Sequence, residues 1–187
     1  MPALPGVRAN LWCPGKFRPG RQAYEKAARH VTLAKPESSW CLNAENARER
    51  QAMNVVDLDS RHRTALPSII AGDFNAAPSA ASIRYLTGLQ SLEGRSAHHH
   101  DPWAIAGEGP GLTWTLDNPN AAGVIGQIVG QPGHGRQIDS IFGGGWDAHP
   151  KAKATVRAIE RVVDTPVDGV WLSDHYGVLA DIEFSAA

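Results

Sequence analysis

Near its middle the sequence reads Pro67-Ser-Ile-Ile-Ala-Gly-Asp-Phe-Asn75, a short apolar run that ends in an acid and an amide. An uninterrupted run of this kind is typical of a strand buried on both faces, because a half-buried strand alternates apolar and polar residues. Gly72 punctuates the run, and Asp73 and Asn75 follow it. The sequence therefore predicts a central strand that presents a carboxylate and an amide at its C-terminal end.

Helical and strand-like patterns flank this stretch. Residues 44–58 place apolar side chains at helical spacing, and Ser79 to Leu86 follow Pro78, which suits the first turn of a helix. We expect Ile83 and Leu86 to face the core. Alternation or β-propensity predicts further strands in residues 30–33, 112–116, 124–129, 136–142 and 178–184.

The composition is that of an ordinary globular domain. With 187 residues one domain is the default, and 18 basic against 19 acidic residues give no overall positive field to steer the chain to nucleic acid. A local basic groove is still compatible with this charge. Cys13 and Cys41 lack the paired spacing of a zinc site or the density of a disulfide scaffold. No apolar run approaches the roughly 18 residues of a membrane span.

The amino-terminal segment differs from the rest. Its first 22 residues are rich in Pro and Gly, which oppose a long helix or a central strand. We therefore expect residues 1–30 to be an irregular N-terminal segment and residues 31–187 to form the domain. No hydrophobic stretch follows the early basic residues, so the chain as written is expected to be cytoplasmic. A secreted protein is expected instead if an amino-terminal half precedes Met1.

Chemically suggestive residues cluster in motifs at or beside predicted strand ends: Gly72-Asp73-Phe74-Asn75, Gln137-Ile138-Asp139-Ser140-Ile141-Phe142 and Ser173-Asp174-His175. Their order and spacing resemble the later motifs of the endonuclease/exonuclease/phosphatase superfamily, which read Gly-Asp-Phe-Asn, Arg-Ile-Asp-Tyr-Ile-Phe and Ser-Asp-His. The segment Gly111-Leu112-Thr113-Trp114 fits a further element of many members. The resemblance extends from about Arg50 to Phe184.

This resemblance implies an α/β (α+β) fold, namely the four-layer β-sandwich of that superfamily. The chain would hold its second half and be incomplete at the N-terminus. The family usually contributes an Asn on an early strand and a Glu, its principal metal ligand, from the first half. No clear counterpart of either is evident here. Arg136 also precedes Asp139 by one position more than in the family motif, and Ser140 replaces the usual Tyr.

The resemblance also implies roles for individual residues. Asp73 would orient the attacking water or accept its proton, and Asn75 would donate to a phosphoryl oxygen. His175 would contact the same phosphate, with Asp139 bound to its far ring nitrogen. Asp174 and Asp73 would serve the metal, directly or through water. Elementary chemistry agrees, because phosphoester hydrolysis at neutral pH calls for carboxylates, a histidine and usually a divalent cation.

We therefore expect a Mg²⁺-dependent hydrolase acting on a phosphodiester or phosphomonoester, a nuclease or phosphatase, with Mn²⁺ as a substitute metal. Its partner would be a phosphoester substrate, with nucleic acid among the candidates. The alternative is a catalytically inactive, truncated family member that acts as an interaction module or remnant. The missing first half leaves three accounts open: a truncated gene, completion by a partner chain or self-association, and a reduced substitute within the first 30 residues.

Simpler interpretations accompany each motif. Gly-Asp-Phe-Asn alone could be a turn in which an Asp side chain bonds its own backbone. The run His98-His99-His100-Asp101 predicts a solvated loop rather than a metal site, since consecutive residues rarely converge on one ion. Most of the tryptophans are expected to pack against the core, and Trp114 is the one to test for substrate contact.

Overall fold

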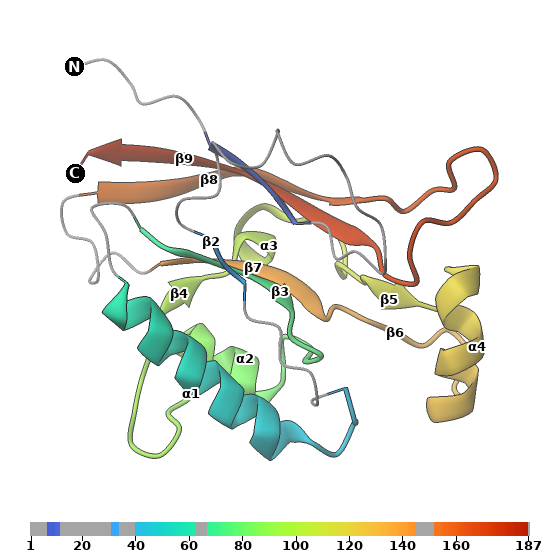
Figure 1. Cartoon of the computed structure of the whole chain (residues 1–187), viewed down its shortest axis with the longest axis horizontal. Helices are drawn as coiled ribbons and strands as arrows, with labels where there is room; N and C mark the ends of the chain where they lie inside the picture. Colours follow the sequence, from blue (N-terminus) through green and yellow to red (C-terminus); the bar gives the residue numbers. More distant parts are fainter. Residues whose placement is uncertain (1–6, 12–30, 34–39, 63–66, 145–151, 187) are drawn as a thin grey trace.

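Two β-sheets pack face to face, and helices cover the outer face of the larger sheet (Figure 1). The computed structural model of the chain describes residues 7–11, 31–33, 40–62, 67–144 and 152–186. The larger sheet consists, in spatial order, of β2 (Val31–Leu33), β3 (Ile69–Asp73), β7 (Asp139–Gly144) and β4 (His99–His100). The smaller sheet consists, in spatial order, of β1 (Val7–Leu11), β9 (Gly177–Ala186) and β8 (Ala152–Val162).

A short antiparallel pair and the helices complete the described part of the chain. The pair is formed by β5 (Trp114–Thr115) and β6 (Gly135–Arg136). The helices are α1 (Glu45–Arg61), α2 (Ala81–Leu86), α3 (Pro102–Ala106) and α4 (Pro119–Ile128). Figure 1 shows α1 and α2 side by side beneath the larger sheet, and α4 at the end of the molecule near β5 and β6.

Strand β3 is buried along its length as far as Asp73. It runs parallel to β2 and antiparallel to β7. On one face Ile70 packs with Phe142 against α1 and α2, whereas Ile69 and Ala71 on the other face belong to the core between the sheets. This burial on both faces confirms the strand predicted from the apolar run.

Strand β9 closes the core between the sheets. Val178, Ala180, Ile182 and Phe184 are buried against the larger sheet and alternate with more exposed neighbours. The strand predicted over residues 178–184 is therefore confirmed. Among the described residues no helix covers the outer face of this smaller sheet, so the described layers are the α1–α2 layer and the two sheets (Figure 1).

Helix α1 presents one apolar face to the core, where Ala52, Met53 and Val55 pack with residues of α2. The two helices are also joined by a polar contact, because Glu45 Oε1 accepts a hydrogen bond from the backbone N–H of Ser82 at 2.8 Å. Both helices were predicted from the sequence, and the predicted burial of Ile83 and Leu86 on α2 is confirmed.

Residues 124–129 were predicted as a strand, but residues 124–128 belong to α4 and Val129 is its C-cap, so that prediction is wrong. The helix begins after Asn118, whose side chain accepts a hydrogen bond from the backbone N–H of Asn120 at 3.0 Å, and Pro119 occupies its first turn. Its β-branched residues suggested a strand, but Ile125 is fully buried against β5 and Ile138. The cap and the helical burial outweigh the local β-propensity.

The single strand predicted over residues 136–142 is interrupted. Between β6 and β7 the backbone N–H of Ile138 donates to the Thr113 hydroxyl at 3.1 Å, and the carbonyl of Ile138 accepts from the N–H of Phe74 at 2.8 Å. Strand β8 was not predicted, because its exposed face carries charged residues such as Lys153, Arg157 and Glu160 among small ones.

The amino-terminal expectation also needs correction. Residues Val7–Leu11 are not irregular: they form β1, which pairs antiparallel with β9. The high Pro and Gly content around these residues concealed the strand. The rest of residues 1–30 lies outside the described part of the chain, so the domain division after residue 30 stays a prediction.

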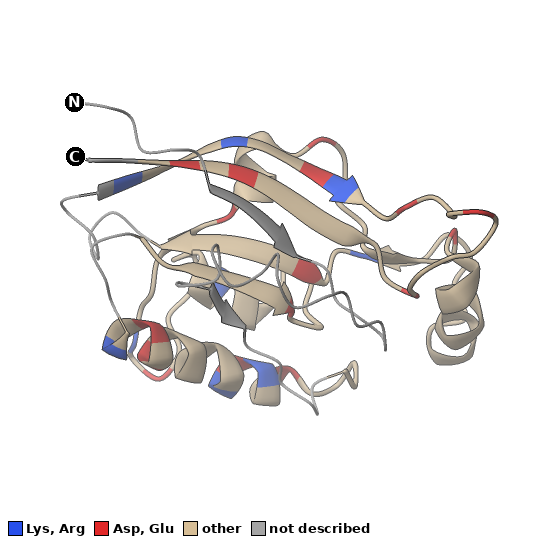
Figure 2. Ribbon diagram, turned by 45° about the horizontal axis from the view of Figure 1, so that its top comes forward, with Lys and Arg blue, Asp and Glu red and all other residues tan. Residues whose placement is uncertain are grey.

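Charged residues of both signs are interspersed on the described surface. Figure 2 shows basic and acidic positions along α1 and along the β8–β9 hairpin, which agrees with a formal net charge of −1. In the described ranges, no helix combines the length and the apolar character needed to cross a bilayer.

Candidate active site

The strand register of the larger sheet brings two carboxylates together. Asp73 ends β3 and Asp139 begins β7, and the two residues are partners in the antiparallel register. His175 reaches the same place from the segment just before β9. One ligand atom from each of Asp73, Asp139 and His175 lies within 4.8 Å of the other two. Three motifs far apart in the sequence therefore meet at one end of the sandwich.

The contact between His175 and Asp139 is direct: His175 Nδ1 lies 2.9 Å from Asp139 Oδ2, and both side chains are largely buried. The sequence analysis expected this pairing. It missed Thr113, although the Gly-Leu-Thr-Trp element was noticed. The Thr113 hydroxyl accepts the backbone N–H of Asp139 at 3.1 Å, and the Thr113 carbonyl accepts that of Tyr176 at 2.7 Å. Thr113 thus fixes the backbone beside both members of the pair.

Asn75 lies against Asp73. Its backbone N–H donates to Asp73 Oδ1 at 2.8 Å, and its side-chain amide donates to Oδ2 at 3.1 Å. The backbone contact is the turn that the simpler interpretation of Gly-Asp-Phe-Asn described, in which an Asp bonds the N–H two residues on. Asp73 nevertheless belongs to the acid–histidine cluster, so the turn and the cluster share one carboxylate.

Charge and burial shift the pKa values of the cluster. Burial, followed by the charge of Asp139, raises the pKa of Asp73 to about 6, although the Asn75 N–H and the charges of His175 and Arg136 act in the opposite direction. Burial alone would lower the pKa of His175. The hydrogen bond and charge of Asp139, helped by Asp73 and Asp174, outweigh burial and raise the pKa of His175 to about 9. At neutral pH the cluster therefore combines an imidazolium with a carboxylate poised near its titration point.

Asp174, which the sequence analysis placed at the metal, is not brought into this cluster. Its side chain is exposed, and the described group of potential ligands contains Asp73, Asp139 and His175 but not Asp174. Its charge still raises the pKa of the neighbouring His175. A direct metal contact from Asp174 therefore stays a prediction.

Comparison with known proteins agrees with this arrangement. The model of the Endonuclease/Exonuclease/phosphatase family matches residues 5–175. The chain belongs to this family. A search of curated proteins finds no match.

Solved structures show the same fold. This chain superposes on TDP2 from D. rerio, which was crystallised with a single-strand DNA product. The TM-score is 0.58 and the sequence identity is 22%, and the match covers 82% of this chain and 55% of that one. It superposes on an endonuclease/exonuclease/phosphatase from Bacteroides vulgatus with TM-score 0.51, 21% identity and coverage of 75% and 45%. The chain thus spans about half the length of these structures.

Strand β1 carries Asn10, which lies opposite Leu179 of β9 in the register. Among the acids of the first 50 residues, Glu45 and Glu49 lie in α1, and Glu25 and Glu37 lie outside the described residues.

The cluster fits the divalent cation on which this family generally depends. Asp139 Oδ1 is buried and has no hydrogen-bond partner in the described part of the chain, although the other oxygen of the same carboxylate binds His175. A buried anionic oxygen of this kind needs a cation, a proton or water as its partner. Carboxylates are ligands that hard divalent ions prefer. A protonated His175 donates hydrogen bonds and cannot bind a cation, so the carboxylates of Asp73 and Asp139 are the better metal ligands.

Trp114 and the histidine run also lie close to the elements that form the site. Trp114 is 8% exposed and packs with α4, with its ring centre 6.5 Å from that of His175, so its face is not open for stacking on a substrate. The histidine run is not a solvated loop throughout: His99 is buried, and its ring nitrogens face Leu86 O at 3.3 Å and Asp59 Oδ2 at 3.5 Å.

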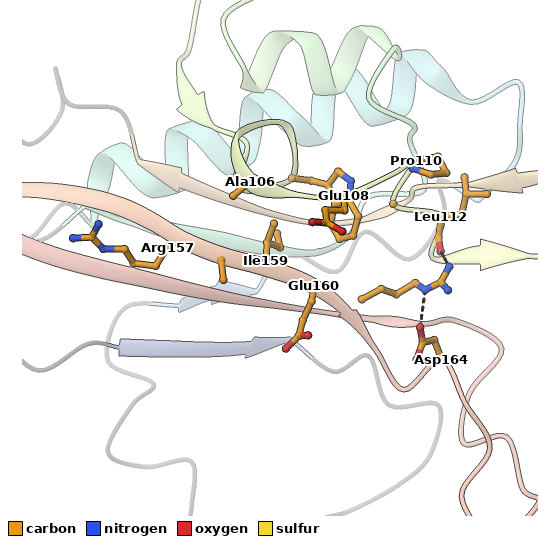
Figure 3. Close-up of a pocket in the computed structure, with 12 residues that line it drawn as sticks. Ala106, Glu108, Pro110, Leu112, Arg157, Ile159, Glu160 and Asp164 are labelled. Carbon is orange, nitrogen blue, oxygen red and sulfur yellow. Dashed lines mark hydrogen bonds and ion pairs between the residues drawn. The ribbon is translucent and has the colours of Figure 1, made fainter.

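A separate groove of about 650 Å³ lies between β8 and the segment that contains and follows α3 (Figure 3). Charged residues of both signs line it, among them Glu108, Arg157 and Glu160. None of Asp73, Asp139 and His175 lines this groove, so its walls and the acid–histidine cluster are made of different residues.

Proposed function

We propose that this chain is a divalent-metal-dependent phosphoesterase of the nuclease/phosphatase type, with Asp73, Asn75, Asp139 and His175 as its catalytic residues. One observation carries the proposal: a hydrogen-bonded His175–Asp139 pair lies within 4.8 Å of the Asp73 carboxylate. A phosphoester is the substrate class that such a set suits, because its hydrolysis needs both a base for water and cationic groups for the phosphoryl oxygens.

Asp73 acts on the attacking water. A base works best when its pKa lies near the operating pH, and the pKa of Asp73, raised to about 6, leaves the carboxylate able to take a proton at pH 7. The two hydrogen bonds from Asn75 fix the orientation of this carboxylate. The amide nitrogen of Asn75 carries a second hydrogen, which can be donated to a phosphoryl oxygen.

His175 supplies positive charge. With a pKa near 9 the ring is an imidazolium at pH 7, and Asp139 engages Nδ1, so the other ring nitrogen is left to donate to phosphate. A divalent cation, when bound, offsets charge that develops on the phosphoryl oxygens. Asp73 and Asp139 would hold it, with Asp174 acting through water. Hard oxygen donors favour Mg²⁺, and Mn²⁺ is the natural substitute.

Nucleic acid is one candidate among the phosphodiesters. The D. rerio TDP2 structure contains a single-strand DNA product, which makes oligonucleotides a sensible first substrate for this chain. The formal net charge of −1 argues against a protein dedicated to long duplexes, because such proteins depend on many basic contacts with phosphate. Short single strands and small phosphomonoesters are therefore the substrates to compare.

The test is turnover of bis(p-nitrophenyl) phosphate and p-nitrophenyl phosphate by the purified chain with Mg²⁺, Mn²⁺ or EDTA. We expect metal-dependent turnover of at least one substrate, lost by more than about 100-fold in Asp73→Asn and His175→Ala. Arg157→Met is the matched control, since Arg157 is an exposed residue of β8. Wild-type rates in both site variants, with melting temperatures unchanged, would rule the assignment out.

One observation favours a second function, that of an inactive interaction module. β1 and β2 lie at sheet edges, and no strand in the described ranges covers their outer sides. Open edges invite pairing with another chain. Sedimentation analysis separates the two functions: a stable self-associated form without metal-dependent turnover supports the module, and a monomer with turnover excludes it.

A further inference from the structure

Asn75 has an unusual backbone conformation. Its φ is 51°, in the left-handed region that residues other than glycine seldom enter, although Asn tolerates it better than most. This conformation lets the backbone N–H and the side-chain amide of one residue engage both oxygens of Asp73. The geometry of the proposed base therefore depends on keeping Asn75 in this conformation.

The carbonyl of Asn75 is held by a residue distant in the sequence. Arg136 Nη2 donates to Asn75 O at 2.8 Å. Arg136 is itself fixed by its backbone, since it pairs with Trp114 between β6 and β5 and its carbonyl accepts the N–H of Thr113 at 2.9 Å. Thr113 also holds Asp139. Thr113 and Arg136, which are hydrogen-bonded to each other, therefore support both residues: Thr113 holds the backbone N–H of Asp139, and Arg136 holds the carbonyl of Asn75.

The guanidinium of Arg136 is half-buried. Burial and the charge of Arg48 lower its pKa, while Asp73 and Glu45 act in the opposite direction, and an arginine in this position remains charged. A hydrogen bond from a charged donor to a carbonyl is stronger than one from a neutral donor. Arg136 is also the residue whose position departs from the family's Arg-Ile-Asp motif. Gln137, which occupies the usual position, is buried.

We propose that Arg136 is a positioning residue, which holds the Asn75 turn through its carbonyl and so orients Asn75 and Asp73 for catalysis. This proposal rests on the proposed phosphoesterase function, but the contact itself is testable without turnover. Arg136 does not bind the phosphate in this account. Its removal should therefore change the rate of the reacting complex and leave substrate affinity unaltered.

The experiment compares wild type with Arg136→Met, Arg136→Lys and the control Arg157→Met, which removes an exposed guanidinium hydrogen-bonded to Glu183 at 2.6 Å. We expect kcat of R136M to fall about 10- to 100-fold with KM within twofold, because small errors in position cost that much. R136K keeps a cationic donor and should recover at least a third of the wild-type kcat. R157M should match wild type in both constants.

Nuclear magnetic resonance gives a readout independent of activity. In ¹⁵N-labelled protein the backbone and side-chain amide signals of Asn75 should shift in R136M, return toward wild type in R136K and stay in place in R157M. An unchanged Asn75 in a folded R136M overturns the proposal, as does a raised KM with kcat retained, which would make Arg136 an anion-binding residue. If wild type shows no turnover, the proposed function fails and the Asn75 signals still decide the role of Arg136. Should R136M fail to fold, the R136K spectrum and kinetics decide it.

Discussion

The hydroxyl of Thr113 accepts a hydrogen bond from the backbone N–H of Asp139 at 3.1 Å, and Thr113 is fully buried. The same oxygen accepts the N–H of Ile138 at 3.1 Å. Thr113→Val preserves the shape and leaves both buried N–H groups without this partner, which costs about 1–3 kcal/mol for each group. We expect a melting temperature lowered by several degrees, measured by circular dichroism. Thr113→Ser keeps the hydroxyl and should lose much less, and equal losses in the two variants would contradict the assignment.

The His175–Asp139 pair should make stability depend on pH. Because the folded pKa of His175 is raised to about 9, above its ordinary value near 6.5, its contribution is fully present below pH 6.5 and is lost as pH rises through 9. The upper bound is on the order of 3 kcal/mol. Urea unfolding at pH 6 and pH 10 should show a steeper loss for wild type than for His175→Gln. Parallel losses in the two proteins would show that another group is responsible.

Asp73 should titrate unusually high in the metal-free protein. Burial, followed by the charge of Asp139, raises its pKa to about 6, so its carboxyl signal should change with a midpoint near pH 6. The measurement is the pH dependence of the Asp73 carboxyl ¹³C signal in labelled protein with EDTA. A midpoint near pH 4, the ordinary range of an aspartic acid, would contradict the assigned environment.

Two adjacent glycines of β7 make a matched pair for packing. A Cβ on Gly144 would lie 2.9 Å from the backbone nitrogen of Ser68, whereas one on Gly143 would meet no atom of the described residues within 4 Å. Gly144→Ala should therefore destabilise the fold by about 1–3 kcal/mol. Gly143→Ala should be nearly neutral in the same urea titration. A reversed order would mean that the end of β7 is packed differently.

The sequence predicted that Asp73, Asn75, Asp139 and His175 would lie together, because they stand in short motifs at or beside strand ends, and the structure brings them together. Their register was not predictable, since the partnership of Asp73 with Asp139 depends on the antiparallel pairing of β3 with β7. The supporting residues were harder to foresee. Thr113 acts through its hydroxyl and Arg136 through a carbonyl far along the chain, and neither contact leaves a pattern in the sequence.

The errors in predicting the fold from the sequence have a common physical cause. Local propensity suggested a strand in residues 124–129, where the Asn118 cap and the burial of Ile125 produce α4. It also suggested irregular structure at Val7–Leu11, where pairing with β9 produces β1. In each case a contact with a distant segment outweighed the preference of the residues themselves. The central strand was predicted correctly because its uninterrupted run of apolar residues itself indicates burial on both faces.

The register that joins Asp73 to Asp139 also ties chemistry to the order of folding. These acids come from strands far apart along the chain, so a large loop must close before they meet, and that closure costs conformational entropy. Partly folded chains would hold each acid separately and hydrated. The paired, buried carboxylates therefore come together only when the sandwich has assembled.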